Sequence, residues 1–203
     1  MSSFFTENVY ENPDRILRML DLAGAKSSAS DNNQDLVVLV ENNGTVIEGE
    51  CKRQFADGKK RLDALGYMLG GSTVLRTDFS GTNLVQSDLI VVRQSDAATA
   101  SLWSLYKSQT STTNLKVQLS VFKAGGDNSP DAQPTLEIVL SQARVTAISA
   151  LTSTTMAVPC EIVFFLFGCL EIRSAPQLAQ GQRGAVRTCT IDLSLPAVSL
   201  GQS

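Results

Sequence analysis

The stretch VPCEIVFFLFGCLEI, residues 158–172, limits what this chain can fold into more than any other part of it. Its central nine residues, 162–170, carry no charge and no polar side-chain atom other than one thiol. A membrane-spanning helix needs roughly 20 apolar residues, and this run is closed after nine by Glu161 and Glu171. A membrane span is therefore excluded here. A metal or thiol site, a buried helix, and a strand buried on both faces remain.

The overall composition predicts one hydrophobic core of ordinary size. The chain has 203 residues, of which 43% are hydrophobic, enough for a core and a small appendage. Its 17 basic and 20 acidic residues give a formal net charge of −3, without a block of lysine or arginine. Because nucleic-acid-binding proteins usually carry a basic stripe, we expect no nucleic-acid partner and no direct insertion into a membrane.

The chain lacks the residues that most catalytic and metal sites need. It contains no histidine, which removes the commonest zinc ligand sets and every Cys-His or Ser-His nucleophile. Its cysteines form no C-x-x-C pair, and we expect four reduced, mostly buried thiols. They are Cys51, Cys160, Cys169 and Cys189. We therefore predict no catalytic residue, no metal site and no cofactor, and we expect that the protein is not an enzyme.

The first 35 residues differ from the rest. Asn12-Pro13-Asp14 is typical of a helix start, and Gly24 is typical of a helix end. Between them, apolar residues recur at helical spacing: Ile16, Met19, Leu20 and Ala23. The polar segment KSSASDNNQD follows. We predict an extension over 1–35, made of a short amphipathic helix and a linker, and one domain over 36–203. The first residues show no secretory signal, so we expect a cytoplasmic protein.

From Asp35 onward the apolar residues mostly alternate with a period of two, which indicates strands. LVVLVENNGTVIEGEC predicts a hairpin that turns at Asn42-Asn43-Gly44. Further strands are expected at 62–69, at 88–94, within 114–123 and 135–149, and within 185–195. In the last of these, the aligned residues Cys189, Ile191, Leu193 and Leu195 would end the core. The stretch 70–83, rich in Gly, Ser and Thr, predicts a loop.

One segment, SDAATASLWSLYKS, departs from this alternation and predicts a helix capped by Ser95 or Asp96. We expect its single tryptophan, Trp103, to plug the interior of a barrel or sandwich. Eight to nine short strands with one or two helices predict a mainly β fold, a small antiparallel β-barrel with a capping helix. Taken as a strand, 158–172 is apolar on both faces, so we expect the barrel interior on one side and a helix or another chain on the other.

Several segments, in the right order, resemble the Hcp family, the tube proteins of type VI secretion systems. In the second half they are LWSLYKSQTSTTNLKVQLSVFKAGGDN, LEIVLSQARVTAIS and PCEIVFFLFGCLEI. Upstream, IEGEC at 47–51 is similar to the family's I-x-G-E-S, with Cys51 in place of serine. LDALGYMLGG is similar to I-D-V-L-x-x-x-x-G, with Tyr67 where tryptophan is usual. The resemblance covers about residues 36–195.

This resemblance implies a barrel subunit that forms hexameric rings, which stack into the inner tube of a contractile injection machine. The implied partners are further copies of the chain, sheath, spike and baseplate proteins, and effector proteins in the channel. The machine would also export its own tube without a signal peptide. Contractile phage tail tubes have the same fold and give an alternative function.

The resemblance also implies interface residues. An extended loop that contacts a neighbouring subunit or ring would comprise Gly70, Gly71, Ser72, Thr73, Val74, Leu75, Arg76, Thr77, Asp78 and Phe79. A strand facing the channel would carry Leu65, Tyr67 and Met68. The turn of the family motif would be Lys123, Ala124, Gly125, Gly126, Asp127 and Asn128. A function of another class, a monomeric ligand-binding β-barrel, would instead need a polar pocket in the interior.

Overall fold

The computed structural model describes residues 35–75, 82–122, 132–151, 159–176 and 184–193. The first strands are β1 (Asp35–Asn42), β2 (Thr45–Val46), β3 (Leu62–Asp63), β4 (Gly66–Met68), β5 (Gly71–Leu75), β6 (Thr82–Gln86) and β7 (Leu89–Gln94). After helix α2 (Ala98–Ser108) come β8 (Leu115–Phe122), β9 (Leu136–Leu151), β10 (Cys160–Leu166), β11 (Cys169–Ser174) and β12 (Arg187–Asp192). The mainly β prediction is confirmed. The predicted helix at 13–23, the turn at 123–128 and Leu195 lie outside the described residues.

One antiparallel sheet contains all these strands except β5 and β6. Its order is β2-β1-β8-β9-β10-β7-β4, with β3 added on β1, β11 added on β9, and β12 added on β11. The predicted hairpin is confirmed, because Asn43 and Gly44 take the positive φ angles, 50° and 83°, that a tight hairpin turn requires.

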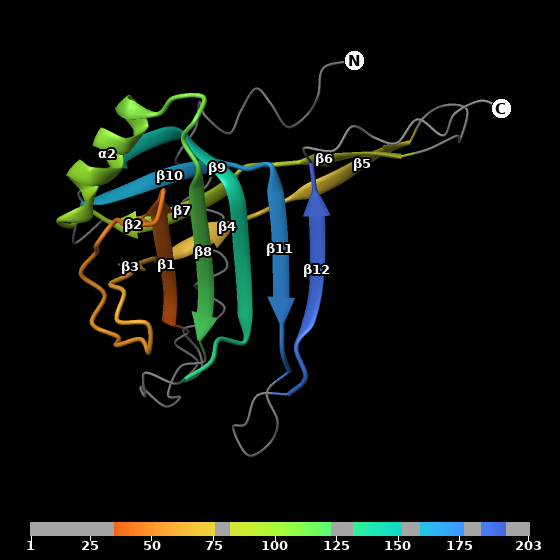
Figure 1. Cartoon of the computed structure of the whole chain (residues 1–203), viewed down its shortest axis with the longest axis horizontal. Coiled ribbons are helices and arrows are strands. Elements are labelled where there is room, and N and C mark those ends of the chain that lie inside the picture. The colour runs from red at the N-terminus through yellow and green to blue at the C-terminus, as the bar shows by residue number, and fades with distance from the viewer. Residues whose placement is uncertain (1–34, 76–81, 123–131, 152–158, 177–183, 194–203) are drawn as a thin grey trace.

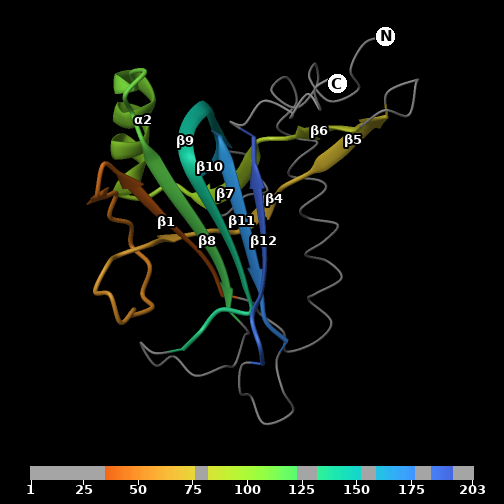
Figure 2. The same cartoon turned by 45° about the vertical axis from the view of Figure 1, so that its right-hand side comes forward.

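The long strand β9 folds this sheet over on itself. Its first half pairs with β8 and β11, and its second half pairs with β10. The halves meet near Gln142, whose φ is 53°, and β10 carries a register shift opposite the second half. Both features are typical of a β-bulge, which increases bend and twist. Figure 2 shows β9 arching over, and Figure 1 shows β10 and β7 crossing behind the strands of the first half.

The segment 62–68 joins the two ends of the folded sheet. Leu62 lies opposite Val38 of β1, whereas Gly66 lies opposite Val92 of β7. Between them, the Ala64 amide donates to the Leu36 carbonyl and the Leu65 amide to the Val92 carbonyl, at 2.9 and 2.8 Å. The strand predicted at 62–69 is thus two short strands, of which β3 pairs with β1 and β4 pairs with β7. Through them the antiparallel sheet curls round into the predicted barrel.

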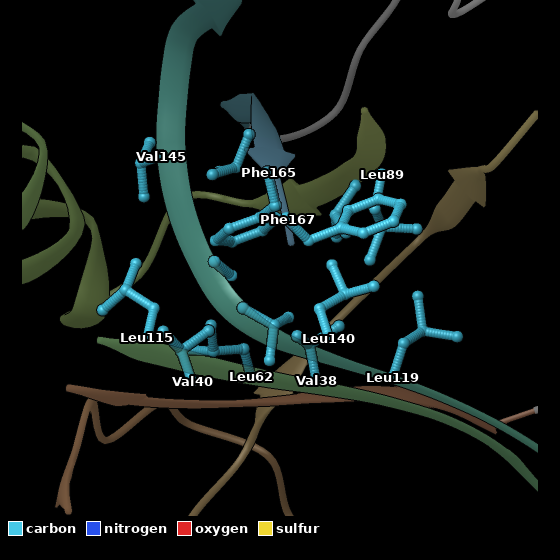
Figure 3. Packing of buried hydrophobic residues seen from close by; sticks show 14 of the residues in the cluster. Val38, Val40, Leu62, Leu89, Leu115, Leu119, Leu140, Val145, Phe165 and Phe167 are labelled. Carbon is cyan, nitrogen blue, oxygen red and sulfur yellow. The ribbon is translucent and has the colours of Figure 1, made fainter. Parts of the chain in front are cut away.

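Apolar side chains fill the barrel. Figure 3 shows residues from β1, β8, β9 and β10 converging on one interior cluster. Helix α2 covers one end and adds three buried side chains to the same cluster: Ala98, Leu102 and Leu105. Trp103 does not plug the barrel, because it lies next to Leu102 on the outward side of the helix and is 40% exposed. That prediction was wrong.

The run 158–172 forms two strands, because the chain leaves the strand conformation at Phe167-Gly168 between β10 and β11. Both faces of β10 are buried from Cys160 to Phe165, as predicted, whereas Leu166 at its end is 49% exposed. Val163 and Phe165 join the interior cluster, and Ile162 and Phe164 join a second cluster on the outer face. In one continuous strand, Leu170 would lie on the same face as Ile162, because the two residues are an even number apart. The break at Phe167-Gly168 changes this, and Leu170 packs in the interior cluster.

Two further predictions need correction. The described part of the predicted loop at 70–83 is mostly strand, because β5 (71–75) and β6 (82–86) pair over five registers. The cysteines are not mostly buried: Cys160 is buried, Cys51 and Cys169 are half-buried, and Cys189 is exposed. Among the described strands β12 pairs only with β11, and all of its residues except Ile191 are exposed, so Cys189 does not end the core. Ile191 and Leu193 pack against the interior cluster, as predicted.

Candidate assembly surfaces

The hairpin β5–β6 is the first candidate interface. It forms a two-stranded sheet of its own, and Figure 1 shows it projecting past β11 and β12 on the side away from α2. Neither strand has a second partner among the described residues, so the backbone along both long edges is available for pairing. An isolated two-stranded hairpin is marginally stable at best in water, which makes this one a suitable element for another chain to bind.

A tight neck fixes the hairpin to the barrel. The Ser87 amide donates to the Gly70 carbonyl at 2.9 Å, and the Gly70 amide donates to the Ser87 hydroxyl at 2.8 Å. A Cβ added at Gly71 would come within 3.0 Å of the Gln86 side chain. The structure therefore brings Gly70, Gly71 and Ser72 of the predicted interface into this neck, and Thr73, Val74 and Leu75 into the backbone of β5. Arg76, Thr77, Asp78 and Phe79 lie outside the described residues.

The outward face of the first half of the sheet is a second candidate surface, and it is polar. The Gln118 amide donates to Glu137 at 3.0 Å, and Arg173 contacts both Glu137 and Glu171. These residues alternate with interior ones such as Leu119, Ile138 and Ile172 on the same strands. On β12 every residue but Ile191 is exposed. The polarity of this face was visible in the sequence alternation, yet the sequence prediction did not select it as a channel lining.

The residues predicted to face a channel do not share a face. Leu65 is 58% exposed, at the break between β3 and β4. Tyr67 packs against the interior cluster, and Met68 packs against the second cluster, on the outer face of the sheet. Burial raises the pKa of the Tyr67 hydroxyl.

The IEGEC segment, which the sequence singled out, anchors the capping helix. The Glu50 amide donates to Asp96, and the Ala97 amide donates back to Glu50, both at 3.3 Å. Asp96 also accepts from the Ala98 amide at 2.7 Å, although the N-cap position itself is Ala97, one residue after the predicted Ser95 or Asp96. Gly49 is required because an added Cβ would lie 2.6 Å from the Arg61 carbonyl oxygen.

Beneath the start of α2 lies a buried group of charges. Arg93 pairs with both Glu161 and Asp96, and Arg93 and Glu161 are 1% and 0% exposed. The Thr99 hydroxyl also donates to Glu161, at 3.3 Å. Burial raises the pKa of Glu161, although the Arg93 guanidinium opposes this shift. The group ties β7 and β10 to the helix and lies away from any open hollow that the structure shows.

No group of three or more potential metal ligands occurs among the described residues. Burial, together with the neighbouring Asp63 carboxylate, raises the pKa of Cys51 to about 12, which leaves its thiol protonated and a poor nucleophile. None of the helices in the described part is long and apolar enough to cross a membrane. One surface hollow is lined in part by Asp35, Cys51 and Asp63, and two others lie elsewhere on the described surface.

No protein-family model and no curated protein matches this sequence. The fold, however, matches solved structures over most of both chains. Hcp1 from Salmonella typhimurium superposes with a TM-score of 0.57 at 16% identity, covering 79% of this chain and 96% of that one. The fold is that of the Hcp proteins. This finding confirms the resemblance that the sequence motifs indicated.

Other solved structures give the same result. One described as a type six secretion system protein has a TM-score of 0.60 at 16% identity, covering 78% of this chain and 96% of the other. A type VI secretion system effector from Yersinia pestis has a TM-score of 0.53 at 18% identity, covering 76% and 98%. The Hcp fold is therefore complete here, and about a fifth of this chain lies outside it.

Proposed function

We propose that this protein is a non-enzymatic structural subunit of the inner tube of a contractile injection machine of the type VI kind. Copies of the chain form hexameric rings, the rings stack into a tube, and effector proteins travel in the channel. Sheath, spike and baseplate proteins are the other partners. The tube subunit is made in the cytoplasm and leaves the cell through the machine itself.

The observation that carries this proposal is the projecting hairpin on an Hcp-fold barrel. Its two unpaired edges supply backbone donors and acceptors that a second chain can satisfy. Because it projects from one side, it contacts a different part of the neighbouring copy, and a head-to-tail contact of this kind closes into a ring when the rotation allows.

The polar sheet face supports the same function. A channel that holds water and passing proteins needs a lining that binds neither tightly. The outward face around Gln118, Glu137 and Arg173 carries charged and amide groups already paired with one another. We therefore assign the channel lining to this face and not to Leu65, Tyr67 and Met68.

The ligand-binding barrel is less well supported. Such a protein encloses its ligand in a concave pocket with a few polar groups. Here, side chains from seven strands and α2 fill the interior, including Phe165 and the adjacent Phe167 (Figure 3). The interior is packed as a core, so a ligand has no space where this function requires one.

A shortened hairpin tests the proposal. Residues 73–84 are replaced by an Asn-Gly turn, which keeps the neck at Gly70 and Ser87, and the mass in solution is measured by light scattering. We expect a folded monomer, in contrast to rings from the full chain. The cooperative unfolding of this variant should resemble that of the full chain, because the hairpin is a separate sheet. Unchanged ring formation by the shortened chain would contradict the proposed interface.

A further inference from the structure

The outer face of the second half of the sheet is apolar and fully buried. Its centre consists of Ile90 and Val92 on β7 and Ile162 and Phe164 on β10, which are 0–2% exposed. In the register, Ile90 lies opposite Phe164 and Val92 opposite Ile162, so the four side chains form one compact patch. We name these four residues the outer cluster.

The described part of the chain does not account for this burial. The partly buried apolar residues packed against the outer cluster are Met68 and Ala147, which belong to the flanking strands β4 and β9 of the same sheet. Helix α2 buries its apolar residues in the interior cluster instead. Leaving such side chains in water would cost about 1.5–3 kcal/mol each, so another segment has to cover this face.

We propose that residues 13–23 of the same chain form an amphipathic helix that covers the outer cluster. Ile16, Met19, Leu20 and Ala23 fall on one face of a helix, and the apolar Leu17 and Leu22 lie on its two sides. Asp14, Arg18 and Asp21 fall on the opposite face, which would point to solvent. The segment therefore carries the one-sided apolar stripe that the patch needs.

The length of a helix over residues 13–23 agrees with the width of the face that it would cover. An 11-residue helix, 13–23, is about 16 Å long at 1.5 Å per residue. The four strands β4, β7, β10 and β9 span about 14 Å at a spacing near 4.8 Å, so one helix laid across them reaches from Met68 to Ala147.

The place where β1 begins supports an occupant from the same chain. The Leu36 carbonyl accepts from the Ala64 amide, and the next amide, that of Leu65, donates to Val92 in the outer cluster. The first described residue, Asp35, is thus close to one corner of the patch. The linker 24–34 can extend to about 36 Å at 3.3 Å per residue, more than the patch requires. The geometry favours this tethered segment over a second copy, whose binding would depend on concentration.

The buried thiol of Cys160 gives a direct test, since it is 3% exposed and lies at the start of β10, two residues before Ile162 and on the same face of the strand. The test uses the full chain with Cys51, Cys169 and Cys189 changed to serine. We compare the rate of maleimide labelling at Cys160 in this background, in a Met19→Asp/Leu20→Asp variant, and in an Arg18→Asp control on the polar helix face. We expect labelling at least about tenfold faster in the first variant, because the cover opens locally, and unchanged in the control. Equal rates in all three proteins would overturn the proposal.

A crosslink distinguishes the possible occupants without disturbing the fold. Leu20→Cys is combined with the native Cys160 in the same background, and the protein is oxidised at low and high concentration; Arg18→Cys is the matched control. We expect a disulfide within one chain, formed equally at both concentrations and absent from the control. A two-chain product would show that a second copy covers the face, and no crosslink would exclude residues 13–23; both results overturn the inference. Neither measurement depends on ring formation, so this inference can fail while the proposed function stands.

Discussion

At the scale of single residues, the least replaceable contacts lie where α2 meets the barrel. Arg93 and Glu161 face each other across β7 and β10, and Asp96 adds a second carboxylate from the start of the helix. Removing one member of a buried ion pair leaves an uncompensated charge and typically costs 3–5 kcal/mol. Nothing in the sequence around Arg93 separates it from the exposed arginines, because the burial of this pair arises only from the sheet register.

We predict that Arg93→Met lowers the free energy of unfolding at pH 7 by about 3–5 kcal/mol. Urea unfolding measures the loss. An Arg93→Met/Glu161→Leu variant should recover most of it, because apolar groups then replace both charges. Lys60→Met is the matched control: Lys60 pairs with Glu48 at 3.3 Å, both side chains are about two-thirds exposed, and the change should cost less than about 1 kcal/mol. A loss in Arg93→Met no larger than in the control would contradict this account.

The same variant should respond to pH. Burial raises the pKa of Glu161 in the folded chain, so between its ordinary value and the raised one the folded state binds more protons than the unfolded state. Stability from this group is therefore present at low pH and is lost as the pH rises through the raised pKa. The Arg93 guanidinium opposes this rise, so without it the pKa of Glu161 should lie higher still, and the pH range over which stability is lost should extend to higher pH. Unfolding measured from pH 5 to pH 8 should show a steeper loss in Arg93→Met than in the parent chain, and parallel profiles would show that Glu161 is not the group responsible.

Thiol chemistry offers another residue-scale prediction. At pH 8, a maleimide should label Cys189 rapidly, because its strand is exposed, whereas Cys51, with a pKa of about 12, should react far more slowly. Peptide mass spectrometry after short exposure reports both sites in one sample. Comparable labelling of Cys51 and Cys189 would mean that Cys51 is neither buried nor held by Asp63 as described.

At the scale of elements, period-two alternation predicted nearly every strand of the barrel and helical spacing predicted α2. The hairpin β5–β6 was missed because Gly70, Gly71 and Ser72 are typical of loops, although β-branched Thr73 and Val74 follow them. The orientation of Trp103 could not be predicted, because it depends on which side of α2 the barrel lies. The joining role of Leu62–Met68 depends on pairing with two distant strands, which no local pattern reveals.

The contact between IEGEC and the rest of the barrel gives a test at this scale. In Gly49→Ala the added methyl group would meet the Arg61 carbonyl oxygen and Leu62, so we expect a loss of about 1–3 kcal/mol from overpacking. Thermal unfolding, followed by circular dichroism, measures it. Glu48→Ala, at the exposed neighbouring position, is the control and should stay within about 0.5 kcal/mol. If both variants unfold alike, Gly49 is not held as closely as the structure places it.

At the scale of the whole molecule, the chain combines a filled barrel with surfaces that a monomer does not need. Among the described strands, β5 and β6 pair only with each other and β12 pairs only with β11, while one sheet face is polar and the other is apolar and buried. The two-faced strand at 158–172 indicated assembly from the sequence. The structure places the apolar outer face on β7 and β10 and the unpaired backbone on the hairpin. The apolar face that the sequence revealed is therefore a different surface from the hairpin edges that we propose for contact between copies.

The mass of the purified full chain in solution, measured by light scattering and followed by negative-stain images of the same peak, tests ring assembly most directly. The account predicts a species near six times 21.7 kDa, seen as closed rings or short stacked tubes. A particle that remains at the mass of one chain at high concentration, with no rings in the images, would contradict it.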